Sequence, residues 1–491
     1  MNKLNDWLKA QIKLWLLFLI RKLDENYHNV PIIRLSADSS FNRKLKIPFA
    51  VIMAVTGIIL YFMILFQVGL CLRNAVAVFI IFSIILFFVV FYITKSTKIS
   101  KIDNDTAILV SFILIVSLLV FQIFDHSLSP VAFPMSAFAM ILSVLISLRA
   151  GFIYIFVMTI FLAVTDNFNN ITLITHFIGC LTSVIGIKEI SKRSQFVNVG
   201  IKVSMSMILF VIVLYLFGIY TPDEAKYNAW FSLLSGFLSV LIVLSTLPIL
   251  ETLFSRTTNM KLIELVDFNN TLLKRLMVEA PGTYHHSLIT ASLAEQAATA
   301  IGENSLLARA SAYYHDIGKL KNPEYFIENQ NSKRNPHDEL SPSLSGLILI
   351  SHVKDGVALA KKYKIDDIII QAINEHHGTS IIQYFYNKAL EQNKELNEQD
   401  FRYPCHKPTT KVTAILMIAD SVEAISRILP DKNAGKLKEV VEKVINNKFT
   451  DGQFSECPIT LADLVKIAEN MTTTLCGIYH ARIEYKEFEK K

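Results

Sequence analysis

The chain has 491 residues, 52% of them hydrophobic and 33 of them phenylalanine, and its mean hydropathy is +0.41. This composition exceeds ordinary soluble usage and excludes a uniformly water-soluble protein. The formal net charge of +6 is modest and lies mostly beside apolar segments. We therefore interpret it as membrane topology and expect no nucleic-acid polymer as a partner. The five cysteines are scattered without paired spacing, which excludes a disulfide framework.

The first 46 residues are predicted to form a cytoplasmic segment that carries an amphipathic helix at the membrane surface. Lysines and arginines surround Trp7 and Trp15, a pattern that is typical of interfacial helices. The apolar run from Leu14 to Ile20 is too short to cross a membrane. It also lacks the small-residue cleavage site of a signal peptide.

Residues 47–250 consist mainly of apolar runs, which predict a transmembrane region in contact with the lipid bilayer. A helix needs roughly 20 apolar residues to cross the hydrocarbon core. By this criterion we expect about eight spans, at 47–70, 75–94, 107–124, 130–148, 151–165, 171–187, 202–220 and 230–250.

The charges between these runs predict the orientation. The loops at 94–103 and 187–195 are basic, whereas the loops at 125–129, 166–170 and 221–226 are neutral or acidic. With eight spans, basic and non-basic loops alternate as the positive-inside rule requires. We expect a multi-pass protein of the inner (plasma) membrane with both termini in the cytoplasm.

Residues 251–491 have the composition of a soluble domain and apolar residues at three- and four-residue spacing, which is typical of helices. Pro281-Gly282 interrupts the first helical stretch, and no segment has the pattern of a strand. We therefore predict an all-α protein: a polytopic transmembrane helix bundle followed by a cytoplasmic all-helical domain.

Seven histidines and aspartates of this domain lie at helix ends or on apolar helices, where an unpaired polar side chain is costly. They are His286, His315, Asp316, His352, His376, His377 and Asp420. Imidazoles and carboxylates together favour Fe, Mn or Zn over Mg or Ca. Seven ligands are too many for one ion with an open position, so we expect two ions that share Asp316.

Taken singly, each of these residues has an ordinary structural interpretation. A lone helical histidine is usually a hydrogen-bonded structural residue, and Asp420 could cap a turn or pair with Lys411 or Arg427. His285, beside His286, is left out of the ligand set, and His406 is interpreted as part of a solvated turn. The order of the motifs along the chain carries the metal hypothesis.

That order resembles the HD superfamily of metal-dependent phosphohydrolases, in which a His, a His-Asp pair and a late Asp follow one another. The closer resemblance is to the seven-transmembrane HD family of PgpH-type cyclic di-AMP phosphodiesterases. It extends over residues 250–490 and rests on the motifs PGTYHHSLITASLAEQAA, ARASAYYHDIGKLKNPEYFIENQ, NPHDELSPSLSGLILISHVKDGVALAKKY, INEHHGTSII, FRYP and IADSVEAISR.

The resemblance implies a dinuclear iron or manganese site and hydrolysis of cyclic di-AMP to pApA by a metal-activated hydroxide. One ion would be held by His286, His315, Asp316 and Asp420. The other would be held by Asp316, His352, His376 and His377. Lys319, three residues after Asp316 on a helix expected to continue, would donate to a non-bridging phosphate oxygen, so Asp316 and Lys319 are the expected catalytic residues.

Two further expectations concern the substrate and the membrane region. The polar residues Asn335, His337, Ser341 and Ser345 are candidates to line the nucleotide site. Relatives typically carry a large extracellular domain after the first span, but here only residues 71–74 separate the first two spans. Sensing would then fall to the membrane bundle, and a homodimer is among the oligomeric states left open.

Two other functions remain as alternatives. A cyclic di-GMP phosphodiesterase of the HD-GYP type usually has an acidic residue after the histidine pair, whereas GTSII follows here. A membrane receptor could bind a nucleotide in its HD domain without hydrolysing it; loss of a ligand residue would favour this function, and none is lost.

Overall fold

The computed structural model describes residues 49–69, 71–95, 104–127, 129–165, 170–187, 190, 192–330, 335–392 and 397–479. The predicted interfacial helix within residues 1–46 lies outside these residues, as do residues 96–103 of the first basic loop and residues 188, 189 and 191 of the second. The described part of the chain is helical and contains no strand, only an isolated antiparallel bridge between Ile381 and Arg402. The prediction of an all-α protein is confirmed.

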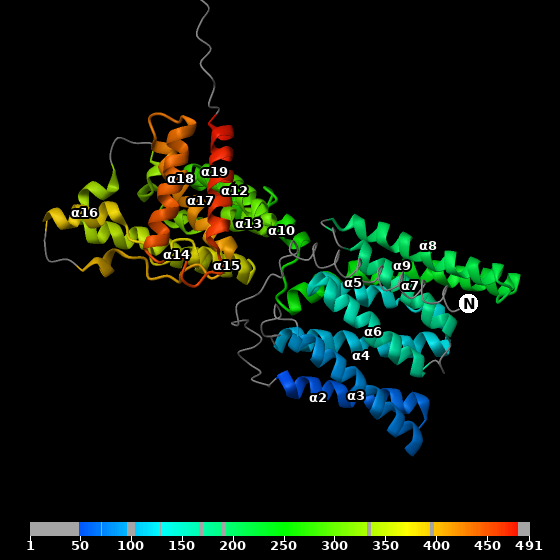
Figure 1. Ribbon diagram of the computed structural model, residues 1–491. Helices are drawn as coiled ribbons and strands as arrows, with labels where there is room; N and C mark the ends of the chain where they lie inside the picture. Colours follow the sequence, from blue (N-terminus) through cyan, green and yellow to red (C-terminus); the bar gives the residue numbers. More distant parts are fainter. Residues whose placement is uncertain are drawn as a thin grey trace, which may run out of the picture. The chain divides into compact units, whose positions relative to one another are not determined.

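The described residues form two compact units, and the chain passes from the first to the second between Met260 and Lys261. The first unit contains eight apolar helices, labelled in Figure 1. These are α2 (Phe49–Val68), α3 (Leu72–Lys95), α4 (Asn104–Ser127), α5 (Met135–Leu145), α6 (Leu148–Thr165), α7 (Asn170–Gly186), α8 (Ser194–Leu216) and α9 (Pro222–Leu253).

Four of these helices, α4, α6, α8 and α9, are long and apolar enough to cross a membrane, with mean hydropathies of 2.0 to 2.8. The other four contain shorter apolar stretches. Large apolar side chains such as Phe66, Leu216 and Trp230 are exposed on the outside of this unit. In water such a surface would aggregate, whereas in lipid it is the favourable one. The first unit therefore has the character of a membrane-embedded bundle.

Close backbone approach holds α8 against α9, and the two helices lie side by side (Figure 1). A Cβ atom on Gly236 would meet the Oγ atom of Ser204 at 2.0 Å and the carbonyl oxygen of Gly200 at 2.7 Å. Small residues at such contacts let helices pack closely where no hydrophobic effect drives them together. Helix α9 begins with a capping box between Thr221 and Glu224, which fixes where it starts.

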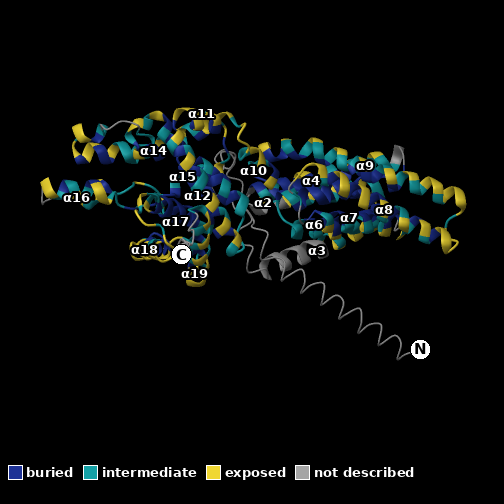
Figure 2. Ribbon diagram, turned by 90° about the horizontal axis from the view of Figure 1, so that it is seen from above, coloured by how far each residue is buried: buried dark blue, intermediate teal, exposed yellow. Residues whose placement is uncertain are grey.

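The second unit consists of the α-helices α10 (Asn259–Leu265), α11 (Thr271–Glu279), α12 (Pro281–Ala300), α13 (Ser305–Tyr314), α14 (Pro342–Lys362), α15 (Asp367–Glu375), α16 (Gln383–Gln392), α17 (Lys411–Ile428), α18 (Ala434–Thr450) and α19 (Leu461–Ile478), with 3₁₀ turns between them. Helix α12 packs against α11, α13, α17 and α19. Helix α17 is largely buried, as its dark colour in Figure 2 shows. These two helices form the scaffold of the site.

One local prediction was wrong. The helix that carries His315 was expected to continue through Lys319, but α13 ends at Tyr314 and a 3₁₀ helix runs from Ile317 to Lys321. Asp316 and Lys319 still lie on the same side, because three residues make one full turn of a 3₁₀ helix.

Helix α14 also meets the length criterion for a membrane span, but with a mean hydropathy of only 1.2. It lies within the second unit and packs against α15 and α16.

Candidate metal centre

The structure brings together all seven side chains of the predicted ligand set. One group consists of His286, His315, Asp316 and Asp420, and the other of Asp316, His352, His376 and His377. Within each group, one ligand atom from every residue lies within 4.8 Å of the others. The members come from α12, α14, α17 and the segments that follow α13 and α15, so the chain assembles the site from five places.

Asp316 belongs to both groups, and its two oxygens face different neighbours. Its Oδ2 atom lies 3.1 Å from Nε2 of His315 and 3.5 Å from Nε2 of His286. Its Oδ1 atom lies 3.3 Å from Nε2 of His352 and 3.8 Å from Nε2 of His376. A carboxylate placed in this way can bridge two cations.

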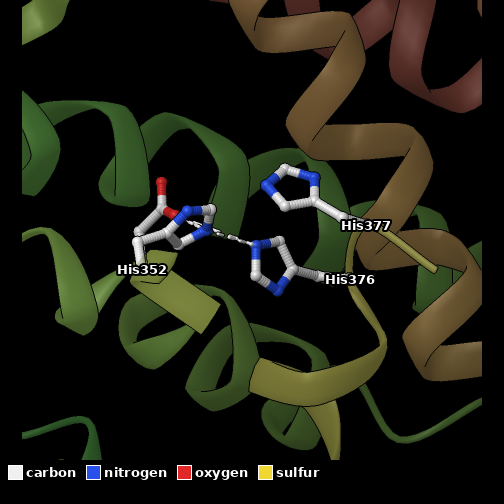
Figure 3. A group of neighbouring side chains, drawn as sticks. His352, His376 and His377 are labelled. Carbon is white, nitrogen blue, oxygen red and sulfur yellow. Dashed lines mark hydrogen bonds and ion pairs between the residues drawn. The ribbon is translucent and has the colours of Figure 1, made fainter. Parts of the chain in front are cut away.

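Hydrogen bonds fix the orientation of three of the imidazole rings. The Nδ1 atoms of His315, His352 and His376 each donate to the backbone carbonyl three residues earlier, at 2.7, 2.5 and 2.7 Å. Because a carbonyl oxygen only accepts, each Nδ1 atom must carry the proton of this hydrogen bond. The other ring nitrogen, Nε2, faces the centre of the site. Figure 3 shows the rings of His352 and His376 facing one another, with their Nε2 atoms 3.4 Å apart.

His377 lies on the more open side of the centre. It is the one member of the two groups that is not fully buried. Its Nδ1 atom lies 3.6 Å from Oδ2 of Asp420, and its ring stacks on Tyr403 with the ring centres 4.2 Å apart.

Gly318 allows the segment after α13 to approach α14. A Cβ atom there would meet the carbonyl oxygen of His352 at 1.9 Å and the amide nitrogen of Gly356 at 2.5 Å. Glycine is therefore required for the close contact that places Asp316 beside His352.

The donor atoms fit a divalent metal. The Nε2 atoms of His286 and His315 and the Oδ1 atom of Asp316 are buried without a well-formed hydrogen bond, although they lie close to one another. Among the described residues, Lys319 is the one lysine or arginine that forms an ion pair with the buried carboxylates of the centre. Bound cations would satisfy these donor atoms and offset the excess of negative charge.

The histidines of the centre fall into two sets, according to whether their surroundings lower or raise the pKa. Burial lowers the pKa of His376 to about 3 and also lowers the pKa of His352 and His377, so these rings are neutral and ready to ligate. Burial acts in the same direction on His315, but the carboxylates of Asp316 and Asp420 outweigh it and raise its pKa to about 10. A metal ion bound at His315 would replace that proton.

Sequence reasoning missed two acidic residues of the site. The buried Glu423 on α17 accepts a hydrogen bond from Nδ1 of His286, and its other oxygen has no partner. Glu328 accepts from Nζ of Lys319 at 2.7 Å and from Oγ1 of Thr283 at 3.1 Å. A signal for Glu423 was present, because it follows Asp420 by three residues on an apolar helix and so shares its face.

The four candidates for nucleotide binding have local structural contacts. Asn335 and Ser341 cap the helical segments that follow them. His337 is buried, with Nε2 2.9 Å from the carbonyl oxygen of Tyr325. Ser345 is buried on α14, and its Oγ atom has no hydrogen-bond partner. None of these contacts tests a role in substrate binding, which stays a prediction.

Known proteins resemble the chain over most of its length. It is 36% identical over 416 residues to the cyclic-di-AMP phosphodiesterase PgpH of Bacillus subtilis (strain 168), covering 82% of this chain and 58% of that protein. It is 37% identical over 425 residues to PgpH of Listeria monocytogenes serotype 1/2a (strain 10403S), covering 83% and 58%. The chain thus spans less than two thirds of the length of these curated relatives.

A crystal structure of the L. monocytogenes phosphodiesterase PgpH HD domain in complex with cyclic-di-AMP also matches. The sequence identity is 46% and the TM-score is 0.42, and the match covers 43% of this chain and 99% of that chain.

Two family models match successive parts of the chain. Residues 72–258 match the family described as a 7TM receptor with intracellular HD hydrolase, and residues 283–425 match the HD domain. The first range contains seven helices, α3 to α9, and α2 precedes it. The second contains all seven residues of the two ligand groups. In successive parts, the chain is thus similar to 7TM receptors with an intracellular HD hydrolase and to HD domains.

Proposed function

We propose that the chain is a membrane-anchored, metal-dependent phosphodiesterase that hydrolyses cyclic di-AMP to pApA. The observation that carries this proposal is the position of Asp316, whose two oxygens face separate groups of ligands. The substrate is inferred from the two relatives, both of which are named cyclic-di-AMP phosphodiesterases.

The proposed ligands are those brought together in the two groups. His286, His315, Asp316 and Asp420 would hold one ion, and Asp316, His352, His376 and His377 would hold the other. The mixed imidazole and carboxylate set supports Fe or Mn. When bound, two such ions supply a nucleophilic hydroxide near neutral pH and stabilise the charge on the reacting phosphate.

Lys319 is the proposed contact to that phosphate. Its ammonium lies 2.7 Å from Oδ2 of Asp316 and 2.7 Å from Oε1 of Glu328. An ammonium has three donors, so one remains for a non-bridging phosphate oxygen. Burial opposes the charge, but Asp316 and Glu328 outweigh it and raise the pKa of Lys319, which keeps the side chain cationic at neutral pH. A donor held in place beforehand is the arrangement that stabilises developing charge.

The proposed location is the inner membrane, with residues 47–250 in the bilayer and residues 251–491 in the cytoplasm. An even number of spanning helices, α2 to α9, would leave both termini on one side. The basic loops predict that this side is the cytoplasm. The connection from α2 to α3 covers only residues 69–71, which supports the expectation that sensing falls to the bundle. A homodimer stays a prediction.

The test uses the full chain in detergent micelles, loaded anaerobically with Fe(II) or Mn(II). Cyclic di-AMP and cyclic di-GMP are incubated side by side, and the products are separated by chromatography. Conversion of cyclic di-AMP to pApA, absent in Asp316→Asn, is the expected result. Tight binding without turnover under both metals would instead identify a nucleotide receptor, and faster cleavage of cyclic di-GMP would favour that substrate.

A further inference from the structure

A second lysine lies beside the metal centre, and neither the ligand set nor the proposed reaction uses it. Lys448, on α18, donates from Nζ to the Oγ atom of Ser380 at 2.8 Å. Ser380 is buried and follows His377 by three residues. Lys448 therefore approaches the centre on the side of His377, whereas Lys319 contacts Asp316.

The turn that carries Ser380 is held in place from several directions. The Thr379 amide donates to Oε1 of Gln453 at 3.0 Å, and Arg402 donates to the Thr379 carbonyl at 2.7 Å. The Tyr403 amide donates to the Ser380 carbonyl at 3.0 Å. The Ser380 hydroxyl thus has a fixed position, and the ammonium bonded to it is positioned with it.

The ammonium of Lys448 forms no ion pair among the described residues. The nearby carboxylate of Asp451 pairs instead with Arg402, at 2.9 Å. Burial lowers the pKa of Lys448, although Asp420 and Asp451 both favour the charged form. A partly buried amine with one neutral acceptor is unfavourable, and an anion beside it would relieve that cost.

The proposed substrate contains a second anionic group that could bind there. A cyclic dinucleotide contains two phosphodiester groups in one ring, and only one of them can react at the metal centre at a time. The other must lie nearby, because the ring is small. We propose that Lys448, together with Ser380, binds this second phosphate and so positions the ring for cleavage at the first. This inference rests on the proposed function and extends it.

The test compares Lys448→Met with Lys443→Met, which removes an exposed lysine from the same helix. Cyclic di-AMP has two phosphodiesters, whereas the linear dinucleoside monophosphate ApA has one and serves as the reference substrate. We expect Lys448→Met in the full chain to raise KM for cyclic di-AMP roughly ten- to a hundredfold, the effect of one charged hydrogen bond. The values of kcat for cyclic di-AMP and of kcat/KM for ApA should change little.

Lys448→Arg keeps the charge and should retain most of the affinity, and thermal unfolding shows whether each variant is folded. An unchanged KM for cyclic di-AMP, or an equal loss with ApA, would overturn the second-phosphate site while leaving the phosphodiesterase intact. If the wild-type protein hydrolyses neither compound, the proposed function fails. Equilibrium dialysis with a hydrolysis-resistant phosphorothioate analogue of cyclic di-AMP then decides the site. Weaker binding by Lys448→Met than by Lys443→Met supports it, and equal binding or none overturns it.

Discussion

His286 and Glu423 are 137 residues apart in the sequence, yet Nδ1 of His286 donates to the Glu423 carboxylate. On the opposite side of the ring, Nε2 lies 3.1 Å from Oδ1 of Asp420. The imidazole is therefore held from both sides, with its ligating nitrogen turned toward the centre. A carboxylate behind a metal-binding histidine fixes the orientation of the ring and makes it a better ligand.

Substitution of Glu423 by glutamine should weaken metal binding without removing a ligand. We expect a loss of affinity of roughly ten- to a hundredfold, which is typical when such a partner is changed. Competition with a chromophoric chelator measures it. Glu442→Gln, on the exposed face of α18, is the control. Equal affinities in the two variants would show that Glu423 does not tune the site.

The shared carboxylate predicts a difference in metal stoichiometry between two ligand variants. Asp316→Asn should lose both ions, because each group needs its charge, whereas His352→Ala should retain about one ion per chain in the group that lacks His352. Elemental analysis after dialysis gives the counts. Asp338→Asn, on an exposed turn, should match the wild type. An Asp316→Asn protein that retains one ion would contradict the bridging role.

Lys319 and Lys321 provide a matched pair for the phosphate contact. Lys319 is buried between Asp316 and Glu328, whereas the side chain of Lys321 is 64% exposed and pairs with Asp355 at 3.0 Å. Lys319→Met should lower kcat about 10²- to 10³-fold, as is usual when a positioned donor is lost. Lys321→Met should leave it nearly unchanged. If both variants keep full activity with cyclic di-AMP, Lys319 does not stabilise the reacting phosphate.

Gly318→Ala should damage the site through packing alone. The added methyl group would collide with the backbone of α14 at His352 and Gly356, so the 3₁₀ helix must move away. We expect the free energy of unfolding to fall by about 1–3 kcal/mol and metal affinity to fall with it. The control is Gly477→Ala in α19, where a Cβ atom meets nothing within 4 Å. It should be neutral or slightly stabilising, since alanine favours helices. Thermal unfolding and chelator competition compare the two.

The fold class could be predicted from sequence because it depends on local periodicity and on the length of apolar runs. The starts of the helices at Pro281, Pro342 and Thr410 can be predicted from the proline and capping residues in the sequence. The 3₁₀ turn after Tyr314 could not be predicted, because the contact of Gly318 with α14 determines it, and that contact is distant in sequence.

The same reason limits the prediction of the site. The ligand residues were suggested by polar side chains in apolar surroundings, a property that each segment shows by itself. Glu423 shares the face of Asp420 on α17 and could have been suspected, whereas Glu328 looks like an ordinary surface glutamate until the helices are packed. Lys448 is similar, since only the turn at Ser380 brings it to the centre.

The single carboxylate shared by the two ligand groups has a consequence for how the protein would respond to its surroundings. If both ions are needed for turnover, the proportion of competent molecules rises with the product of the two occupancies. At low occupancy this product grows as the square of the free ion concentration, so activity would fall more steeply than the supply of metal. If the proposed function holds, hydrolysis of cyclic di-AMP would then slow sharply in a metal-starved cell, and the nucleotide would persist for as long as the shortage lasts.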